Sequence, residues 1–424
     1  MTLPARAQNR LRRGVRACRA ILFGATGVGL IVPALSDAPS VGPGASRASV
    51  YQQVRVLTEI GRRMFSDPAL SGSGQISCAS CHSPSHAFGP PNALAVQKGG
   101  KDLQQYGIRA APTLTYKQAI PQFTEHFRES DDEGDESIDN GPTGGLTWDG
   151  RIDRARDQAL LPLLSPLEMA NEDRVALAAK VEMRYGAALR DALGQSVGIG
   201  DDGLLDVAGK ALEAYQQNYA DFFPYTSKYD GFLAGKMRLN EQELRGLALF
   251  NDETKGNCAN CHISTKAKDG TPPQFTDYGM IAIGVPRNPN IPANRDPRFF
   301  DLGLCGPERR DFSDRGSYCG LFKTPTLRNV ATRRAFFHNG LVHDLREAVA
   351  FYTERDRKPE KWYRRHPDGS VAKFDDLPEA YHGNVNREQP FGGEPGEAPS
   401  LSDAEIDDIV AFLKTLTDGY MPKQ

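Results

Sequence analysis

Cys78-Ala79-Ser80-Cys81-His82 is a Cys-x-x-Cys-His motif, and it occurs a second time as Cys258-Ala259-Asn260-Cys261-His262. In a helical turn the two cysteines of each motif lie close together, so both thiols can bond to the two vinyl groups of one haem. The following histidine then lies under the iron, which makes His82 and His262 the expected axial ligands. A single Cys-x-x-Cys pair would also suit zinc or thiol redox chemistry. Two copies, each with its histidine, instead predict two covalently bound c-type haems.

The N-terminal residues have the composition of an export signal. Six arginines between Arg6 and Arg19 precede an apolar run from Ala20 to Leu35. This run is short for a membrane span and typical of a secretory signal. Residues 1–48 are therefore interpreted as a signal peptide and tether, with no stable membrane span after cleavage and a periplasmic mature protein. An uncleaved anchor is the alternative.

Two further cysteines suit an exported protein, and the overall charge of the chain is nearly balanced. In an oxidising compartment a disulfide between Cys305 and Cys319 is the simplest interpretation of that pair. The chain has 51 basic and 54 acidic residues and a net charge of -3. This balance gives no argument for a nucleic acid as partner.

The chain is expected to be mainly α, with two haem domains of related design. Similar segments lead into both haem motifs, Gly61-Arg62-Arg63-Met64-Phe65 and Gly246-Leu247-Ala248-Leu249-Phe250, and a Pro-Thr-Leu sequence follows each motif. Helical periodicity covers Leu204 to Phe222, and a capping box at Ser402 begins a terminal helix over 402–417. Residues 263–300 and 356–400 lack periodicity and are interpreted as long irregular loops.

Segments between and after the motifs resemble one family. They are Trp148-Asp149-Gly150-Arg151, Gln158 and Glu168 in the first half, and Phe322 to Val330 and Phe337-His338-Asn339-Gly340 in the second. In this combination the chain, from about residue 50 to 417, resembles bacterial dihaem cytochrome c peroxidases and their MauG-type relatives.

The resemblance implies two cytochrome c-like domains. They are an N-terminal peroxidatic haem domain over 49–235 and a C-terminal electron-transfer haem domain over 236–400, with His338 among the haem-binding residues. The terminal helix over 402–417 is expected to pack back on the first domain.

The resemblance also implies roles for three side chains near the first haem. Glu168 would carry a proton between the two peroxide oxygens, which a partly desolvated carboxylate can do. Gln158 would orient the peroxide or a water, and Trp148 would shield the pocket or offer an oxidisable ring. The alternative is a purely structural segment in which Trp148 belongs to the core and Glu168 caps or pairs.

Two departures from the family concern the iron ligands. Typical peroxidases close the first haem with a detachable histidine, but residues 87–111 contain none, so the first haem is expected to be open as isolated. The methionine that follows the Phe-His-x-Gly histidine by fourteen residues is Tyr352 here. A tyrosinate ligand would lower the reduction potential of the second haem. Simple packing of Tyr352, or ligation by Met280, are the alternatives.

Two further departures concern the region between the haems. The MauG-type relatives carry a tryptophan just before the second haem motif. This chain has Lys255-Gly256-Asn257 at that place, so electrons would need another route between the haems. The family's interhaem calcium loses its usual contacts, because Ala110 or Ala111 replaces an asparagine, and Arg333 and Ala335 replace a threonine and a proline. Backbone carbonyls can still bind calcium, which leaves that ion open.

The expected function is peroxide-dependent oxidation. Hydrogen peroxide would react at the first haem, with electrons supplied through the second by a small electron-donor protein, a cytochrome c or a cupredoxin. The alternative is a MauG-like enzyme that oxidises residues of a protein substrate. A pure electron carrier and a haem-based gas sensor are rivals of other classes.

Overall fold

The computed structural model describes residues 46–127, 139–193 and 200–421. From Arg47 onward the chain forms one compact unit. The expected signal peptide lies outside the described residues, except for its last residues, where the first helix begins at Arg47. Of the helices that the structure describes, none is long and apolar enough to cross a membrane.

The expectation of a mainly α fold is confirmed. The described α-helices are α1 (Arg47–Phe65), α2 (Cys78–Cys81), α3 (Ala155–Leu164), α4 (Arg174–Val181), α5 (Ala187–Leu193), α6 (Gly200–Gln216), α7 (Tyr219–Phe222), α8 (Lys228–Leu233), α9 (Glu241–Asn251), α10 (Leu345–Glu354), α11 (Pro359–Trp362) and α12 (Asp403–Lys414). The strands are β1 (Lys98–Gly99), β2 (Gln105–Tyr106), β3 (Met280–Ile281) and β4 (Phe322–Lys323). They form two antiparallel pairs, β1 with β2 and β3 with β4.

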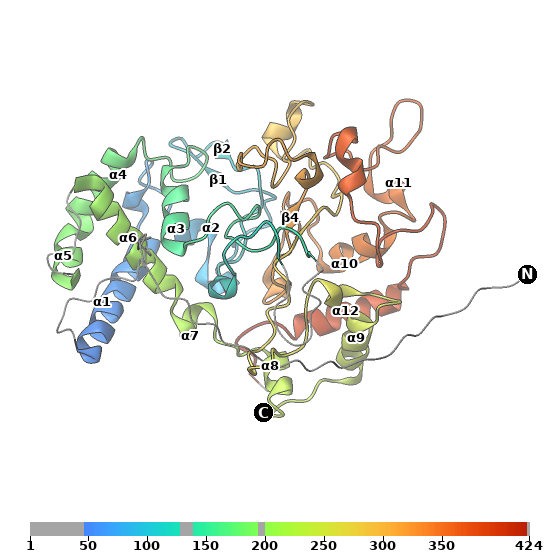
Figure 1. The fold of residues 1–424 in the computed structure, drawn as a ribbon, viewed down its shortest axis with the longest axis horizontal. Coiled ribbons are helices and arrows are strands. Elements are labelled where there is room, and N and C mark those ends of the chain that lie inside the picture. Colours follow the sequence, from blue (N-terminus) through green and yellow to red (C-terminus); the bar gives the residue numbers. More distant parts are fainter. Residues whose placement is uncertain (1–45, 128–138, 194–199, 422–424) are drawn as a thin grey trace, which may run out of the picture. The chain divides into compact units, whose positions relative to one another are not determined.

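The first hydrophobic core forms where α1 crosses α6 (Figure 1). A Cβ on Gly61 of α1 would collide with the carbonyl oxygen of Ala211 in α6. Glycine therefore permits the two helix backbones to touch. The buried residues of this core run from Ile60 to Phe222. The expected helix over Leu204–Phe222 is interrupted, because the Asn218 side chain accepts a hydrogen bond from the Ala220 N–H and begins α7 as a separate helix.

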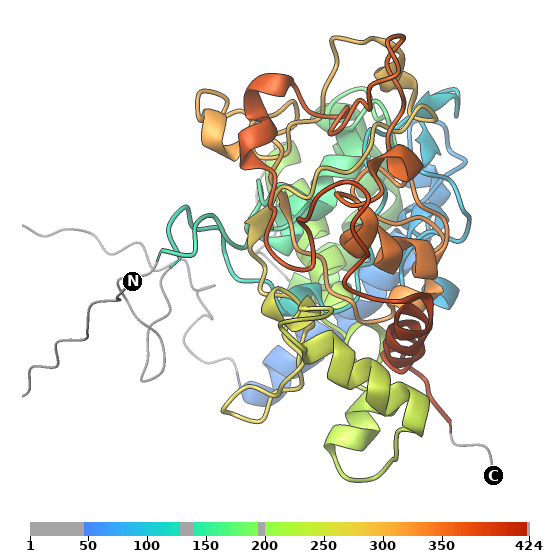
Figure 2. The same cartoon turned by 90° about the vertical axis from the view of Figure 1, so that its right-hand side faces the viewer.

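The second core repeats this arrangement with α9 and α12, which lie side by side in Figure 2. A Cβ on Gly246 of α9 would collide with the carbonyl oxygen of Asp408 in α12. The capping box at Ser402 is present, with the Ser402 side chain accepting from the Glu405 N–H. However, the expectation that the helix over 402–417 packs back on the first domain is wrong. Helix α12 is the partner of α9, as α6 is the partner of α1.

Helix α8 also belongs to the second core. The Tyr229 N–H donates to the Thr415 carbonyl, and the Tyr229 hydroxyl donates to the Ser264 carbonyl at 3.0 Å. The second core therefore begins before residue 236, the expected start of the second domain.

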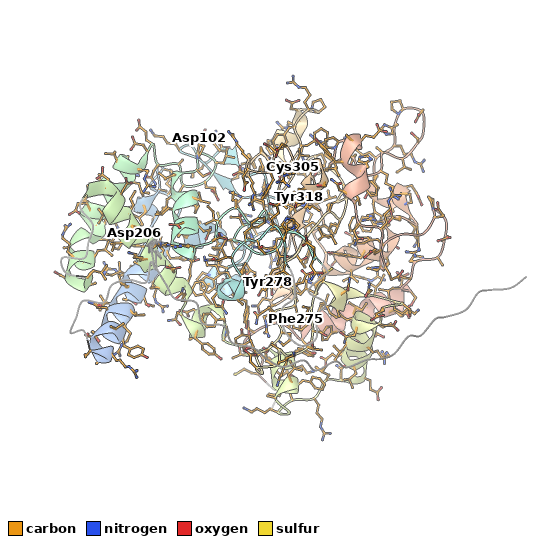
Figure 3. All side chains as sticks on the ribbon, viewed as in Figure 1. Asp102, Asp206, Phe275, Tyr278, Cys305 and Tyr318 are labelled. Atoms are coloured by element: carbon orange, nitrogen blue, oxygen red, sulfur yellow. A yellow bond between two sulfur atoms is a disulfide. The ribbon has the colours of Figure 1, made fainter. Side chains whose placement is uncertain are left out.

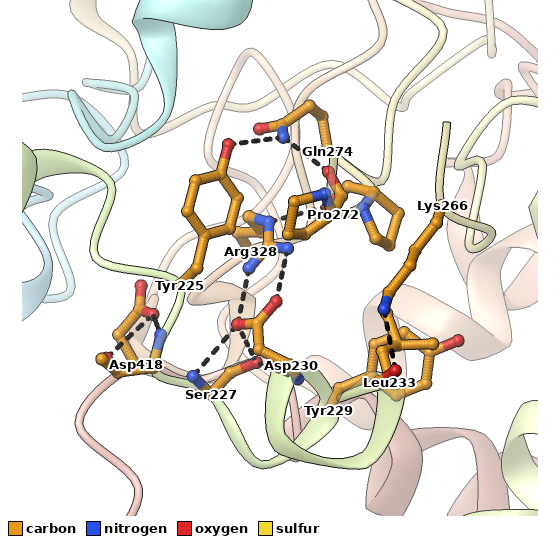
Figure 4. A network of polar contacts seen from close by, with 12 residues as sticks. Tyr225, Ser227, Tyr229, Asp230, Leu233, Lys266, Pro272, Gln274, Arg328 and Asp418 are labelled. Carbon is orange, nitrogen blue, oxygen red and sulfur yellow. Dashed lines mark hydrogen bonds and ion pairs between the residues drawn. The ribbon is translucent and has the colours of Figure 1, made fainter. Parts of the chain in front are cut away.

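Irregular segments between the cores are held by buried polar contacts. The Arg328 guanidinium donates two hydrogen bonds to the Asp230 carboxylate, at 2.9 and 3.0 Å, and a third to the Pro273 carbonyl (Figure 4). Cys305, labelled in Figure 3, is joined to Cys319 by a disulfide. With so little strand structure, these contacts fix the path of the loops around the two sites.

Candidate functional site

The first haem motif forms one wall of a cavity, here the His82 cavity. Helix α2 carries Cys78 and Cys81 into it, and its first turn is held by the Ser77 N–H donating to the Ser80 hydroxyl at 3.0 Å. His82 follows, and its Nδ1 lies 3.1 Å from the Phe88 carbonyl oxygen. The Nδ1–H can only donate to a carbonyl, so the lone pair of the ring is on Nε2, which is free for a metal. Burial lowers the pKa of His82 to about 4, which keeps the ring neutral.

Glu168, Gln158 and Trp148 line the same cavity. The backbone of Glu168 is fixed, because the Gly100 N–H donates to its carbonyl at 2.7 Å and a Cβ on Gly99 would collide with it. Its side chain is surrounded by protein but faces the open cavity. Burial raises the pKa of the Glu168 carboxyl, and its charge in turn raises the pKa of the Cys81 thiol. Glu168 therefore lies within electrostatic reach of the haem-attachment motif.

Lys117 is a residue of this cavity that sequence reasoning missed. Its Nζ donates to the Gln158 Oε1 at 3.2 Å, and only 8% of the residue is exposed. Burial lowers the pKa of Lys117 to about 8. No periodic pattern marks this lysine, but its position three residues after Leu114 of the first Pro-Thr-Leu sequence could have drawn attention to it.

The second haem motif lines another cavity, here the His262 cavity, together with Tyr352 and His338. The His262 Nδ1 lies 2.8 Å from the Phe275 carbonyl oxygen, so Nε2 is again the nitrogen left for a metal (Phe275 is labelled in Figure 3). Burial lowers the pKa of His262. His338 stacks on Phe322 with ring centroids 3.6 Å apart, which fixes the plane of its imidazole.

Tyr352 and Met280, the two ligands considered for the second haem, lie differently. Tyr352 projects from α10 into the His262 cavity. Burial raises the pKa of its hydroxyl, and the nearby haem-motif thiols raise it further. Met280 is not among the residues that line either cavity, and its methyl group packs near Gly150. The geometry favours Tyr352 over Met280.

Trp148 lines both cavities. Its indole N–H donates to the Ala110 carbonyl at 2.8 Å, and its backbone carbonyl accepts from the Lys323 N–H at 2.8 Å. Its ring centroid is 6.5 Å from that of His338. Trp148 comes from a different segment than Lys255-Gly256-Asn257 and lies between the two sites. The expected need for a route other than a tryptophan before the second haem motif stays a prediction, and Trp148 is a residue that could serve it. That position depends on contacts between distant segments, which the sequence pattern does not encode.

Lys323, a second residue missed from the sequence, lines both cavities beside Trp148. Its Nζ donates to the Gly145 carbonyl, and burial lowers its pKa to about 7. A nearby Arg109 guanidinium joins Asp149 at 2.7 Å and Asp301 at 2.6 Å. The two cavities are thus held together by buried charged groups.

The residues present fit two haem groups. The cavities hold about 1670 Å³ and 1370 Å³, the space at their mouths included. Each contains two free cysteine thiols and a neutral imidazole with one unused nitrogen. Vinyl attachment and axial ligation need this set of groups.

This combination of two cavities, each with paired thiols and a histidine, and a carboxyl that faces the first cavity defines a two-haem redox enzyme. Residues 56–238 match the family model described as di-haem cytochrome c peroxidase. The chain is 34% identical over 382 residues to the methylamine utilization protein MauG of Paracoccus denitrificans, with 85% of this chain and 88% of that protein covered. It is 28% identical over 296 residues to the cytochrome c551 peroxidase of Nitrosomonas europaea, with 69% and 71% covered.

Among solved structures, the diheme peroxidase BthA of Burkholderia thailandensis superposes with a TM-score of 0.75 at 41% identity, with 86% of each chain covered. The chain belongs to the dihaem cytochrome c peroxidase and MauG family. It is accordingly a peroxidase-type oxidoreductase with two haem cofactors, as expected from the sequence.

Proposed function

We propose that this chain is a periplasmic enzyme that reduces hydrogen peroxide to water in the His82 cavity, with electrons entering through the haem of the His262 cavity. The observation that carries the proposal is the Glu168 carboxyl, which faces the same cavity as Cys81 and His82 and whose charge reaches the Cys81 thiol. Both haems would be attached covalently, through Cys78 and Cys81 and through Cys258 and Cys261. A small redox protein, a cytochrome c or a cupredoxin, would supply the electrons.

Cys78, Cys81 and His82 would hold the first haem, which would supply the iron for the two-electron reduction of the O–O bond. Among the residues lining the His82 cavity, His82 is the only histidine, which supports an open position as isolated. Glu168, as carboxylate, accepts the proton of the peroxide oxygen nearest the iron and returns it to the other oxygen, which leaves as water. One peroxide, two protons and two electrons give two water molecules.

Gln158 and Lys117 keep the cavity polar on the side of α3. The Lys117 ammonium fixes the Gln158 amide oxygen, so the amide N–H groups of Gln158 point away from Lys117. Those donors are suited to hold a peroxide or water oxygen. Trp148 provides the contact between the cavities through which electrons reach the site of peroxide reduction.

A second function, oxidation of residues on a protein substrate, is favoured by one observation. Tyr352 lies in the His262 cavity where a peroxidase would hold a methionine, and an anionic oxygen ligand stabilises oxidised iron. A haem of this kind is better suited to storing an oxidising equivalent than to accepting electrons from a carrier.

Turnover separates the two functions. The holoenzyme is mixed with hydrogen peroxide and a reduced small c-type cytochrome, and cytochrome oxidation is followed spectroscopically. Rapid, catalytic oxidation supports the peroxidase. Reaction with peroxide that leaves a long-lived oxidised protein and only stoichiometric cytochrome oxidation would overturn it in favour of protein modification. Absence of any reaction with peroxide would overturn both.

A further inference from the structure

Arg333 joins the segment that leads to His338 to a wall of the His82 cavity. Its Nη2–H donates to the Ala111 carbonyl at 3.2 Å, and its Nε–H donates to the Ala335 carbonyl at 3.2 Å. Ala111 belongs to the segment that lines the His82 cavity, whereas Ala335 lies three residues before His338 of the His262 cavity. One guanidinium therefore links a backbone oxygen of the His82 cavity to the segment that leads to His338.

These carbonyl oxygens belong to the region where the sequence resemblance implies an interhaem calcium ion. Calcium takes six to eight oxygen ligands, usually with carboxylates among them. Where the family has an asparagine and a threonine, this chain has Ala110 or Ala111 and Arg333, and none of these side chains carries an oxygen. Within the described part of the chain, no group of three or more histidine, cysteine, aspartate or glutamate side chains could hold a metal ion. The residues present do not fit calcium.

The guanidinium also excludes a second cation by its charge. No protein carboxylate among the described residues forms an ion pair with Arg333. Burial lowers its pKa to about 10, which still leaves it protonated at neutral pH. A calcium ion at the same carbonyls would lie within a few ångströms of this charge and be repelled.

We propose that Arg333 is the permanent cation where the segment that leads to His338 meets the His82 cavity, and that it replaces calcium there. The protein then neither binds calcium nor requires it. The side chain holds the Ala111 and Ala335 backbones together. Its positive charge also lies beside the His82 site, because its Nη2 is 3.2 Å from the carbonyl oxygen of Ala111, a residue that lines the His82 cavity. A fixed positive charge favours the reduced, less positive state of a nearby iron.

The test begins with the metal content of the wild-type holoprotein. It is equilibrated with calcium, passed through a desalting column and analysed by plasma mass spectrometry. We expect no stoichiometric calcium, and no change in haem spectrum or thermal midpoint on addition of EGTA. Stoichiometric calcium whose removal alters the haem spectrum would overturn the proposal. This measurement does not depend on peroxide turnover. The calcium proposal can therefore be refuted while the proposed function stands, and the proposed function can be refuted while the calcium proposal stands.

Variants test the electrostatic part. In Arg333→Ala, the reduction potential of the His82 haem should fall, and in Arg333→Lys, which keeps the charge, most of it should be restored. The neighbouring Arg334 is exposed, so Arg334→Ala is the matched control and should leave the potential unchanged. A wild-type potential in Arg333→Ala would contradict the assigned role of the charge. If Arg333→Ala does not fold, the wild-type calcium measurement still decides the proposal.

Discussion

Replacing Glu168 by glutamine removes the proposed proton carrier while keeping the size and hydrogen-bonding shape of the side chain. General acid–base catalysis by one positioned group contributes about 10²–10⁴-fold to a rate. At about 1.4 kcal/mol per tenfold, the loss corresponds to about 3–5 kcal/mol of activation free energy. We expect Glu168→Gln to slow the reaction of the holoprotein with hydrogen peroxide by that factor, measured by stopped-flow spectroscopy.

The pH dependence of the same rate gives a sharper result. The carboxylate is the form that accepts the proton, so the rate falls as pH drops through the pKa of Glu168. Burial raises this pKa above its ordinary value of 4.5, and the fall therefore begins at a higher pH than for an exposed glutamate. Glu168→Gln should abolish this acid limb.

A neighbouring carboxylate provides the control. Burial is the main cause of the raised pKa of Glu168, and the negative charge of Glu308 raises it further. The Glu308 side chain is 38% exposed. Glu308→Gln should move the acid limb to lower pH and leave the rate at neutral pH unchanged. An unaltered rate and acid limb in Glu168→Gln would refute the assignment of the proton carrier.

Three other substitutions test the fold and the second site. Gly246→Ala forces a Cβ against the Asp408 carbonyl. This overpacking should lower the free energy of unfolding, measured with denaturant, by about 1–3 kcal/mol. Gly383 has open space around it, so Gly383→Ala is the control and should leave that free energy unchanged. Asp230→Asn leaves the Arg328 guanidinium buried without its partner. It should destabilise the protein by about 3–5 kcal/mol, and a loss below 1 kcal/mol would contradict the importance of this pair. Tyr352→Phe should change the absorption spectrum of the second haem and raise its reduction potential; an unchanged spectrum would show that the tyrosine only packs.

The sequence predicted helices well where a local signal marks them. Ser402 and Glu405 form a capping box, and the helix begins there as expected. The apolar stripe of that helix showed that one face is buried, but not against which helix. The partner was assigned wrongly because packing depends on long-range contacts. Gly61 and Gly246, which occupy matching places before the two haem motifs, carried the missing information: each permits one close helix crossing.

The residues of the candidate site also divide into those that a local sequence motif marks and those that only long-range contacts bring to the site. Motif residues such as Glu168 and Gln158 were predicted, and the structure brings both to the cavity lined by His82. Trp148 was expected in that cavity alone, whereas it also lines the other one. Lys117 and Lys323 were not predicted as site residues, because each lies in an element of only two or three residues, which is too short to leave a periodic signal. Their roles follow only from the carbonyl or amide oxygens that fold around them.

The enclosed thiols have a consequence for how the protein matures. Burial raises the pKa of Cys78 and of Cys258 to about 12, so neither is a thiolate at neutral pH, the form in which cysteine reacts fastest. A folded chain without haem would therefore be a poor acceptor for the cofactor. If the haems are attached covalently, as proposed, we expect attachment to come first, while both motifs are still exposed on the unfolded chain. Helix crossing and loop closure then follow around the bound cofactors.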